Sequence, residues 1–325
     1  MLSKLDRYKG ALVGLHAGDA LGAPYETWSA DKVREDMARR GGLVPFDYQN
    51  PWSKKEPPAM CPKGRPTDDS DHAAALAESL IANKGLNQED LFYRLRRVVF
   101  DHVSPLWSGK AFGAGSTTRN ALRPATWEES RDRVFDPMKE FPSNGSLMRA
   151  TPMALLFDFY DKSDWYDVIA MSAVTHRHPL AVEVTCVFVR ILQVLVEGDL
   201  RGVSTLTDAA LGVAWFHAIP ELRTLITNCT RTPRDPEAWP GRGAAALTLH
   251  VALWALTTSD NFRDGLIKAI AVGGDTDTYA AVAGALLGAR YGYEGIPAEW
   301  RECLLGHDKM VELAENLYRI NHQEG

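Results

Sequence analysis

The sequence predicts an all-α fold. Apolar residues recur at helical spacing along most of the 325 residues, whereas the strict alternation typical of strands is nearly absent. Apolar residues make up 45% of the chain, which is enough for a full core. Two acidic motifs far apart in the sequence each precede a helical pattern, so we expect one domain, residues 1–325, in which they share a site.

The predicted helices follow apolar positions three and four residues apart. They are Leu5–Leu21, Ser70–Ala82, Asn87–Val99, Gly145–Asp158, Trp165–Ala173, Pro179–Glu197, Leu206–Ala218, Gly243–Thr257, Phe262–Ala271, Thr276–Tyr291 and His307–Ile320. Three segments rich in proline and glycine are predicted to be long loops: Gly41–Pro66, Ser104–Gly115 and Thr230–Gly243. Long loops of this kind are often binding or lid elements, or linkers. We expect them on a shared face.

The first predicted helix carries glycine at every fourth position. Such a run is unusual, because a glycine inside a helix costs about 1 kcal/mol relative to alanine. The spacing places the glycines on one stripe that lets another backbone approach closely. These residues are Gly10, Gly14, Gly18 and Gly22. The helix from Thr276 has a matching series of small residues: Ala280, Ala281, Ala283, Gly284, Ala285, Gly288 and Ala289. We expect the two helices to touch, as a packing arrangement in preference to a ligand site.

Composition and charge exclude several classes of function. The net charge is −6 and no Lys/Arg-rich tract occurs, so nucleic acid is not an expected partner. The most apolar segment, Cys186–Val196, contains Arg190, so no membrane span or membrane partner is predicted. The four cysteines are widely spaced and suggest neither disulfides nor a cysteine-rich metal site. Without a signal-peptide pattern at the N-terminus, the expected location is the cytoplasm.

The first acidic motif is Pro66-Thr67-Asp68-Asp69-Ser70-Asp71. One of its carboxylates could simply cap the following helix, since Asp and Ser accept hydrogen bonds from free N–H groups at a helix start. A cap does not need three carboxylates and two hydroxyls within five residues. Taken alone, the motif leaves capping and metal binding both open.

The second motif, Val272-Gly273-Gly274-Asp275-Thr276-Asp277-Thr278, favours metal binding. Its glycines permit a sharp turn, and alternating acidic and hydroxyl residues then open another helix. Carboxylate and hydroxyl oxygens suit hard cations such as Mg²⁺ or Mn²⁺. Four or five carboxylates are too many for one Mg²⁺ but suit a pair of ions with bridging oxygens. We therefore expect two Mg²⁺ or Mn²⁺ ions.

Five segments together resemble the ADP-ribosylglycohydrolases, the family of the dinitrogenase-reductase-activating glycohydrolase and the ADP-ribosyl-acceptor hydrolases. They are Gly10–Glu26, Thr67–Ser70, Ser143–Arg149, Thr175–Pro179 and Gly273–Thr278, in the family's order; Gly113–Thr118 is a weaker match. Many relatives have threonine at the position of Ser70; the serine keeps the hydroxyl group. The resemblance implies a compact, single-domain orthogonal helical bundle with a binuclear Mg²⁺ or Mn²⁺ centre at the base of a cleft.

The resemblance also implies roles for individual residues. The metal ligands are Thr67, Asp68, Asp69, Asp275, Asp277 and Thr278. The residues that hold ADP-ribose are Asn144, Gly145, Ser146 and Met148, with His176 beside them. Glu26 matches an acidic residue that in relatives lies on a mobile loop near the metals. Asp19 is expected to anchor a neighbouring loop and not to bind metal.

The residues alone leave the substrate segments open. Ser143–Ser146 is a good turn and helix cap, but backbone N–H groups at such a glycine-containing turn also bind phosphate. A histidine is more commonly a core or surface residue, so only His176 of the pair His176 and His178 is assigned to the site. Trp107 and Phe112 are candidates for stacking on adenine, although a scattered aromatic is usually in the core.

The predicted enzyme is a hydrolase that removes ADP-ribose from protein side chains. Cleavage of an N- or O-glycosidic bond requires attack by water at the anomeric carbon through a positively charged transition state. Asp69 and Glu26 are the predicted catalytic acid or base. Three alternatives remain: a phosphohydrolase acting on the diphosphate, a hydrolase of a small ADP-ribose-containing or nucleoside-like metabolite, and a non-catalytic ADP-ribose-binding relative. The last is disfavoured because all six ligand positions are intact.

Overall fold

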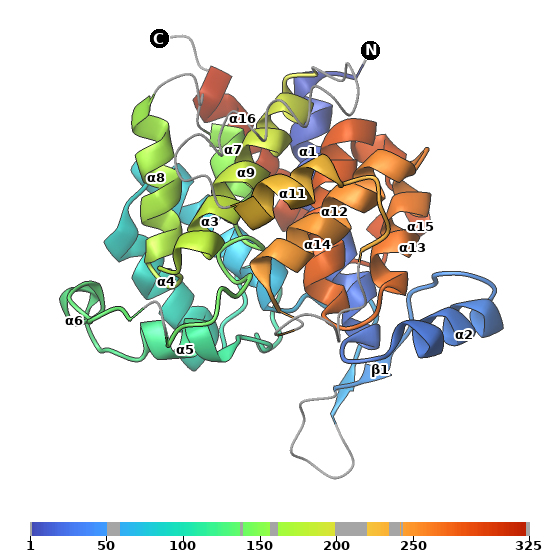
Figure 1. Cartoon of the computed structure of the whole chain (residues 1–325), viewed down its shortest axis with the longest axis horizontal. Helices are drawn as coiled ribbons and strands as arrows, with labels where there is room; N and C mark the ends of the chain where they lie inside the picture. Colours follow the sequence, from blue (N-terminus) through green and yellow to red (C-terminus); the bar gives the residue numbers. More distant parts are fainter. Residues whose placement is uncertain are drawn as a thin grey trace.

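The computed structural model of the chain describes residues 2–50, 59–136, 139–156, 162–198, 220–233, 241 and 243–322. Helices make up most of this part of the chain, and its strands are only two residues long (Figure 1), which confirms the predicted all-α class. In chain order the elements are α1 (Lys4–Gly22), η1 (Ala23–Tyr25), α2 (Ala30–Arg40), β1 (Tyr48–Gln49), β2 (Met60–Cys61), α3 (Asp68–Asn83), α4 (Gln88–Phe100), α5 (Ser116–Leu122), α6 (Trp127–Arg131), α7 (Thr151–Leu156), α8 (Lys162–Ala173), α9 (Pro179–Val196), α11 (Pro220–Thr227), α12 (Ala245–Thr258), α13 (Phe262–Ala271), α14 (Thr276–Tyr291), η3 (Tyr293–Gly295), α15 (Ala298–Arg301) and α16 (His307–His322).

The centre of the molecule is the antiparallel pair α1 and α14. A Cβ atom added to Gly10, Gly14, Gly18 or Gly22 would lie 1.9–2.3 Å from a backbone carbonyl oxygen of α14, at Gly288, Gly284, Ala280 and Thr276 respectively. Real Cβ atoms do not approach an oxygen so closely, so any larger residue would force the two backbones apart. The predicted contact between the two small-residue helices is confirmed, and it is a packing arrangement.

Other helices surround this pair and bring the site together. Both faces of α14 are buried, because α12 and α13 pack on it from the side opposite α1. The first turn of α3 lies beside α1 and close to the first turn of α14. Sequence positions near 20, 70 and 275 therefore meet at one end of the central helix pair.

One helix resembles a membrane span by length and composition. α9 is 18 residues long and strongly apolar, but 72% of it is buried inside the described structure, as expected for a core helix. Its one Arg side chain, at position 190, is half-buried and donates a hydrogen bond to Gln193 over 2.7 Å.

The structure corrects one predicted helix. Residues 144–149 form consecutive turns, and α7 begins only at Thr151, in place of a helix from Gly145. Pro152 explains the late start, because proline has no N–H group and is tolerated only in the first turn of a helix. The turns before it are the segment assigned to ADP-ribose.

The structure also adds short elements that the apolar pattern does not predict. Helix α2 buries only Val33, Asp36 and Met37; their spacing is helical, but with two apolar residues among them the pattern is too short to stand out in the sequence. The predicted loop Gly41–Pro66 contains β1 and β2, which pair antiparallel with Tyr48 opposite Cys61 and lie beside α2 at one edge of the molecule (Figure 1). The predicted helix Leu206–Ala218 and most of Thr230–Gly243 lie outside the described residues.

Candidate active site

Both acidic motifs lie at the first turn of a helix, but few of their side-chain oxygen atoms take part in capping. Thr67 is the N-cap of α3, and its hydroxyl accepts a hydrogen bond from the Asp69 N–H at 3.4 Å. Asp275 is the N-cap residue of α14, yet its side chain makes no capping hydrogen bond. Capping of the two helices therefore does not explain the several carboxylates in these motifs.

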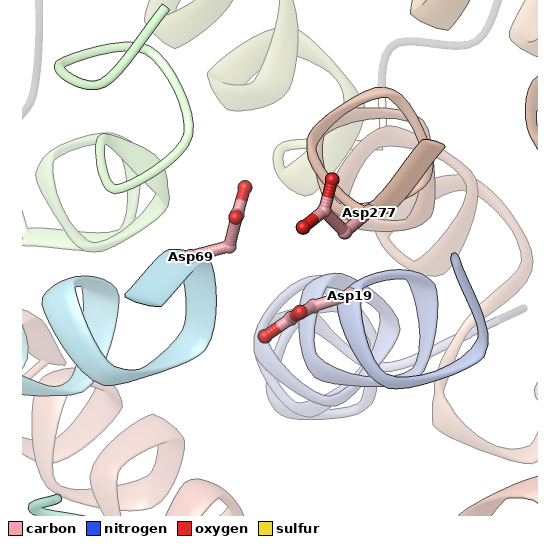
Figure 2. Close-up of side chains that lie close together, drawn as sticks. All are labelled: Asp19, Asp69 and Asp277. Atoms are coloured by element: carbon pink, nitrogen blue, oxygen red, sulfur yellow. The ribbon is translucent and has the colours of Figure 1, made fainter. Parts of the chain in front are cut away.

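The carboxylates form two overlapping groups. Oxygen atoms of Asp19, Asp69 and Asp277 lie within 4.8 Å of one another, and so do those of Glu26, Asp275 and Asp277. Figure 2 shows the first group, with one residue from each of α1, α3 and α14. Asp277 belongs to both groups. A shared carboxylate between two oxygen-rich groups is the arrangement expected of a binuclear site.

Burial and mutual repulsion oppose ionisation of this cluster. Burial, followed by the charges of neighbouring carboxylates, raises the pKa of Asp68, Asp69 and Asp277 well above the ordinary value. Burial also raises the pKa of Asp19, although hydrogen bonds from Thr67 and Ser70 act in the opposite direction. A cluster of this kind is stable as carboxylates only with cations among them.

The donor set fits one or two hard cations. Asp69 is 1% exposed; its Oδ2 atom accepts from the Thr278 hydroxyl at 3.5 Å and lies 3.2 Å from the Thr67 hydroxyl oxygen, whereas its Oδ1 atom has no hydrogen-bond partner among the described residues. A buried carboxylate oxygen without a donor is costly unless it binds an ion. Carboxylate and hydroxyl oxygens without histidine or cysteine match the preferences of Mg²⁺ and Mn²⁺.

A pocket of about 440 Å³ opens above the carboxylates. Five acidic residues line it: Glu26, Asp68, Asp69, Asp275 and Asp277. No lysine or arginine is among the lining residues in the described part of the chain. Asn144, Gly145, Met148 and His176 line it as well. The structure therefore brings five of the six predicted metal ligands and most of the predicted substrate residues to one cavity.

Two predicted site residues do not line the pocket. Ser146 is fully buried, and its hydroxyl forms a hydrogen bond of 3.1 Å with the Thr185 hydroxyl. Its side chain therefore does not face the pocket. Thr67 lies beneath the cavity floor at 1% exposure. Thr67 can still offer its hydroxyl oxygen to an ion beside Asp69.

Asn144 connects the turn to the second acidic motif. Its side-chain amide donates to Asp275 Oδ2 at 2.7 Å and to the Thr248 hydroxyl at 3.0 Å. The backbone N–H of Asn144 also donates to the carbonyl of Gly243 at 3.0 Å. The Asn144 side chain therefore orients one carboxylate of the acidic cluster.

His176 belongs to a directed chain of hydrogen bonds. Ser143 donates its hydroxyl hydrogen to Thr117 (3.0 Å), so Nε2 of His176 must donate to Ser143 (3.0 Å). The Nδ1 atom then accepts from the Thr175 hydroxyl at 2.7 Å. Burial, with nearby Arg149, holds the pKa of His176 well below the ordinary value. His176 is thus a neutral imidazole with a fixed tautomer.

Glu26 is held against the second motif by an unusual turn. Thr27 donates to the Gly274 carbonyl (2.7 Å), and Gly274 donates to the Trp28 carbonyl (2.8 Å). Thr27 has φ +71°, a conformation that β-branched residues rarely adopt. Backbone strain of about 1–3 kcal/mol at such a position is typical of functional sites.

The pocket also includes residues that sequence reasoning left out. Gly113 has φ +113°, and a Cβ atom there would lie 2.2 Å from Asp68 Oδ1, so the weakly matching loop packs directly on the first acidic motif. Phe141 lines the pocket, whereas Trp107 and Phe112 do not. No periodicity or spacing marks Phe141; only its place just before the Ser143–Arg149 segment could have indicated it.

The family model of the ADP-ribosylglycohydrolases matches residues 1–325. This chain belongs to the ADP-ribosylglycohydrolase family. The predicted family and the predicted class of enzyme, a glycosidic-bond hydrolase, are confirmed.

Characterised ADP-ribosylglycohydrolases cover nearly the whole chain. The ADP-ribosylarginine hydrolase of Serratia proteamaculans is 30% identical over 98% of this chain and 81% of its own length. The ADP-ribosyl-(dinitrogen reductase) glycohydrolase of Rhodospirillum rubrum is 28% identical over 91% of this chain and 89% of its own. A solved structure, an ADP-ribosylglycohydrolase-related protein complex, superposes with a TM-score of 0.71 at 29% identity, covering 98% of this chain and 99% of that one.

Proposed function

We propose that this protein uses two divalent cations to hydrolyse the glycosidic bond between ADP-ribose and a protein side chain. One observation carries the proposal. Five carboxylates line a single pocket of about 440 Å³ that has no lysine or arginine among its described lining residues. A cavity of this size suits a ligand as large as a small cofactor. Its unbalanced negative charge suits bound cations.

The cations would be held by Thr67, Asp68 and Asp69 from the start of α3 and by Asp275, Asp277 and Thr278 from the start of α14. When bound, they would supply Lewis-acid stabilisation, orient the ribose hydroxyls and lower the pKa of water. Mg²⁺ and Mn²⁺ both suit these oxygen donors.

Glu26 is the better of the two candidate bases. Asp69 already accepts from the Thr278 hydroxyl through Oδ2, and its unpartnered Oδ1 is suited to an ion, so both of its oxygens have a place in the metal site. Glu26 is half-buried, lines the pocket and is not part of either ligand motif. We assign to Glu26 removal of the proton from the attacking water.

The part of the pocket lined by Asn144, Gly145, Met148 and His176 supplies groups that can bind the rest of ADP-ribose. In the Asn144–Met148 turn the N–H groups of Asn144 and Met148 donate to the carbonyls of Gly243 and Asn144, so we assign phosphate binding to the N–H groups between them, at residues 145–147. His176, neutral at pH 7, lies beside this turn with a Gly145 contact so close that a Cβ atom would be 2.6 Å from the ring. We assign this part of the pocket to the diphosphate and distal ribose.

We further propose arginine as the acceptor side chain. The five lining carboxylates and the buried Asp19 beside them outnumber the four positive charges of two divalent cations, so the site stays net negative. A guanidinium group offsets that remaining charge, whereas a serine hydroxyl does not. The relative from Serratia proteamaculans is named an ADP-ribosylarginine hydrolase, which supports the same choice.

The test is product analysis on two substrates of matched sequence, one ADP-ribosylated on arginine and one on serine. Each is incubated with Mg²⁺, with Mn²⁺ and with a chelator. We expect free ADP-ribose and unmodified peptide from the arginine-linked substrate, with either metal and not with the chelator. Release of AMP would instead indicate phosphoanhydride cleavage. Tight binding of ADP-ribose without turnover would indicate a non-catalytic relative.

A further inference from the structure

Asp19 is the carboxylate whose role the two acidic motifs do not explain. It is fully buried on α1, and its oxygens lie within 4.8 Å of those of Asp69 and Asp277. It does not line the pocket. By position alone it could be a seventh metal ligand or a support for the other six. Its hydrogen bonds decide between these two roles.

Four donors converge on the Asp19 carboxylate, all from the start of α3. The Thr67 backbone N–H lies 3.2 and 3.0 Å from Oδ1 and Oδ2, and the Thr67 hydroxyl donates to Oδ1 at 2.7 Å. The Ser70 N–H and hydroxyl both donate to Oδ2, at 3.1 and 2.5 Å. An ionised carboxylate offers about four lone-pair positions. Three of the donors bond to Oδ2, and Oδ1 accepts from the Thr67 hydroxyl and shares the Thr67 N–H, so both oxygens are directed at the start of α3 and neither is free to face a cation.

The bond to the Thr67 hydroxyl has a specific consequence for metal binding. A threonine that binds a cation must turn a lone pair toward the ion and its hydrogen away from it. Asp19 Oδ1 accepts that hydrogen, so the hydroxyl oxygen faces Asp69 Oδ2 at 3.2 Å. Outer carboxylates commonly orient metal ligands in this way.

Asp19 also has a fixed place relative to the other half of the site. It lies between Gly18 and Gly22, whose added Cβ atoms would lie 1.9 and 2.3 Å from the carbonyl oxygens of Ala280 and Thr276. Those two residues flank Asp277 and Thr278 on α14. One face of α1 is thus locked to α14, while Asp19 is bonded to the start of α3.

We propose that Asp19 is a positioning residue that sets the separation of the two ligand groups and orients Thr67, without binding metal itself. The inference rests on the proposed binuclear site. It assigns to α1 a function beyond packing: the helix holds the Thr67–Asp69 turn at a set distance from Asp277.

The experiment measures Mn²⁺ binding by calorimetry and by electron paramagnetic resonance, on the wild type and on Asp19→Asn. Asparagine has the same shape but can accept only at one atom; with its oxygen in the place of Oδ2, which takes three of the four donors, the Thr67 hydroxyl loses its acceptor. We expect both ions to bind still, with affinity weakened about 10–100-fold. We also expect kcat to recover at saturating Mn²⁺. Two ions at unchanged affinity, or one ion with no recovery of kcat, would overturn the inference.

A second variant covers the case in which Asp19→Asn does not fold. Ser70→Ala removes one donor to Asp19 and keeps the carboxylate, so a smaller loss of Mn²⁺ affinity is expected, again with two ions bound. The matched control is Ser130→Ala, which removes an equally buried hydroxyl whose bond is to the Ala121 carbonyl in a different part of the fold. It should leave Mn²⁺ affinity unchanged. Equal losses in the two alanine variants would contradict a positioning role.

The wild type separates this inference from the proposed function. If the unaltered protein binds no Mn²⁺ by either method, the proposed metal centre is wrong and the inference fails with it. If the wild type binds two ions and releases ADP-ribose while Asp19→Asn is indistinguishable from it, only the positioning role fails.

Discussion

At the scale of single residues, Asp69 is the group on which most of the site depends. It joins the two motifs by accepting a hydrogen bond from the Thr278 hydroxyl, and one of its oxygens is buried without a donor among the described residues. A buried, unpartnered oxygen lowers the stability of the folded protein when no cation is bound. The same oxygen is a ligand when a cation is bound.

We therefore expect Asp69→Asn to lower kcat/KM for ADP-ribose release by about 10³-fold. The metal-free variant should unfold at a higher temperature than the metal-free wild type, because one of several repelling buried carboxylates is gone. Activity assays and thermal unfolding in chelator provide both values. The exposed Asp101→Asn is the control and should match the wild type in both; a stabilised variant with full activity would refute the assignment.

His72 is a second residue whose burial has a measurable effect. It is completely buried, neither ring nitrogen has a partner among the described residues, and burial lowers its pKa to about 3. As pH falls below the ordinary value of 6.5, the unfolded chain takes up a proton that the folded protein refuses. The contribution of neutral, buried His72 to the unfolding free energy is therefore complete above about pH 6.5 and is lost progressively toward pH 3.

The consequence can be tested with His72→Leu. Between pH 7.5 and pH 5 the wild type should lose about 2 kcal/mol more unfolding free energy than the variant, because each pH unit below 6.5 contributes about 1.36 kcal/mol. Urea unfolding at the two pH values measures the difference. His16, whose pKa is lowered to about 4, titrates in both proteins and so cancels in the comparison. Parallel losses in the two proteins would show that His72 is protonated in the folded state.

At the scale of helices, the contact between α1 and α14 leaves no room for a side chain. We expect Gly18→Ala to destabilise the protein by about 3 kcal/mol or more, because its Cβ atom would lie 1.9 Å from a backbone oxygen that cannot rotate away. The control is Gly115→Ala, where φ is −69° and nothing lies within 4 Å of the added atom. It should change the unfolding free energy by less than about 1 kcal/mol. Urea unfolding of both variants decides.

The sequence predicts the long helices well and the short ones poorly, for physical reasons. Helices such as α9 and α14 show strong apolar or small-residue patterns because they are buried on most sides. Helix α2 buries only three residues, and the turns at 144–149 depend on Pro152 and on contacts with distant residues. Neither feature produces a long apolar pattern, since the helical spacing of the buried residues in α2 extends over little more than one turn.

The candidate site divides in the same way. The acidic motifs are visible because each gathers more carboxylates than a cap requires. Gly113 and Phe141 reach the pocket through tertiary packing alone, and Ser146 turns its hydroxyl into the core toward Thr185. The four donors that bond to Asp19 are distant from it in sequence, so their number could not be predicted.

At the scale of the whole molecule, cations in the site would connect segments from both ends of the chain. Mg²⁺ at 100 times its dissociation constant should stabilise the folded state by about 2.7 kcal/mol. We expect Mg²⁺ or Mn²⁺ to raise Tm relative to chelator and to slow hydrogen exchange at the starts of α3 and α14 together. Asp277→Asn, which removes the residue common to both carboxylate groups, should lose this response. Protection confined to one of the two helices would argue against a shared site.

The pairing of α1 with α14 has a consequence for biosynthesis. The first helix leaves the ribosome early, but the surface that its glycines fit is completed only when Gly288 has been translated. Until then the α1 backbone has no partner on that face, and the Thr67–Asp69 turn has no opposing carboxylates. A nascent or truncated chain that ends before α14 can therefore assemble neither the core nor the ion-binding site. Such a chain is expected to depend on chaperones and to be inactive, because contacts of this sequence separation form late in folding.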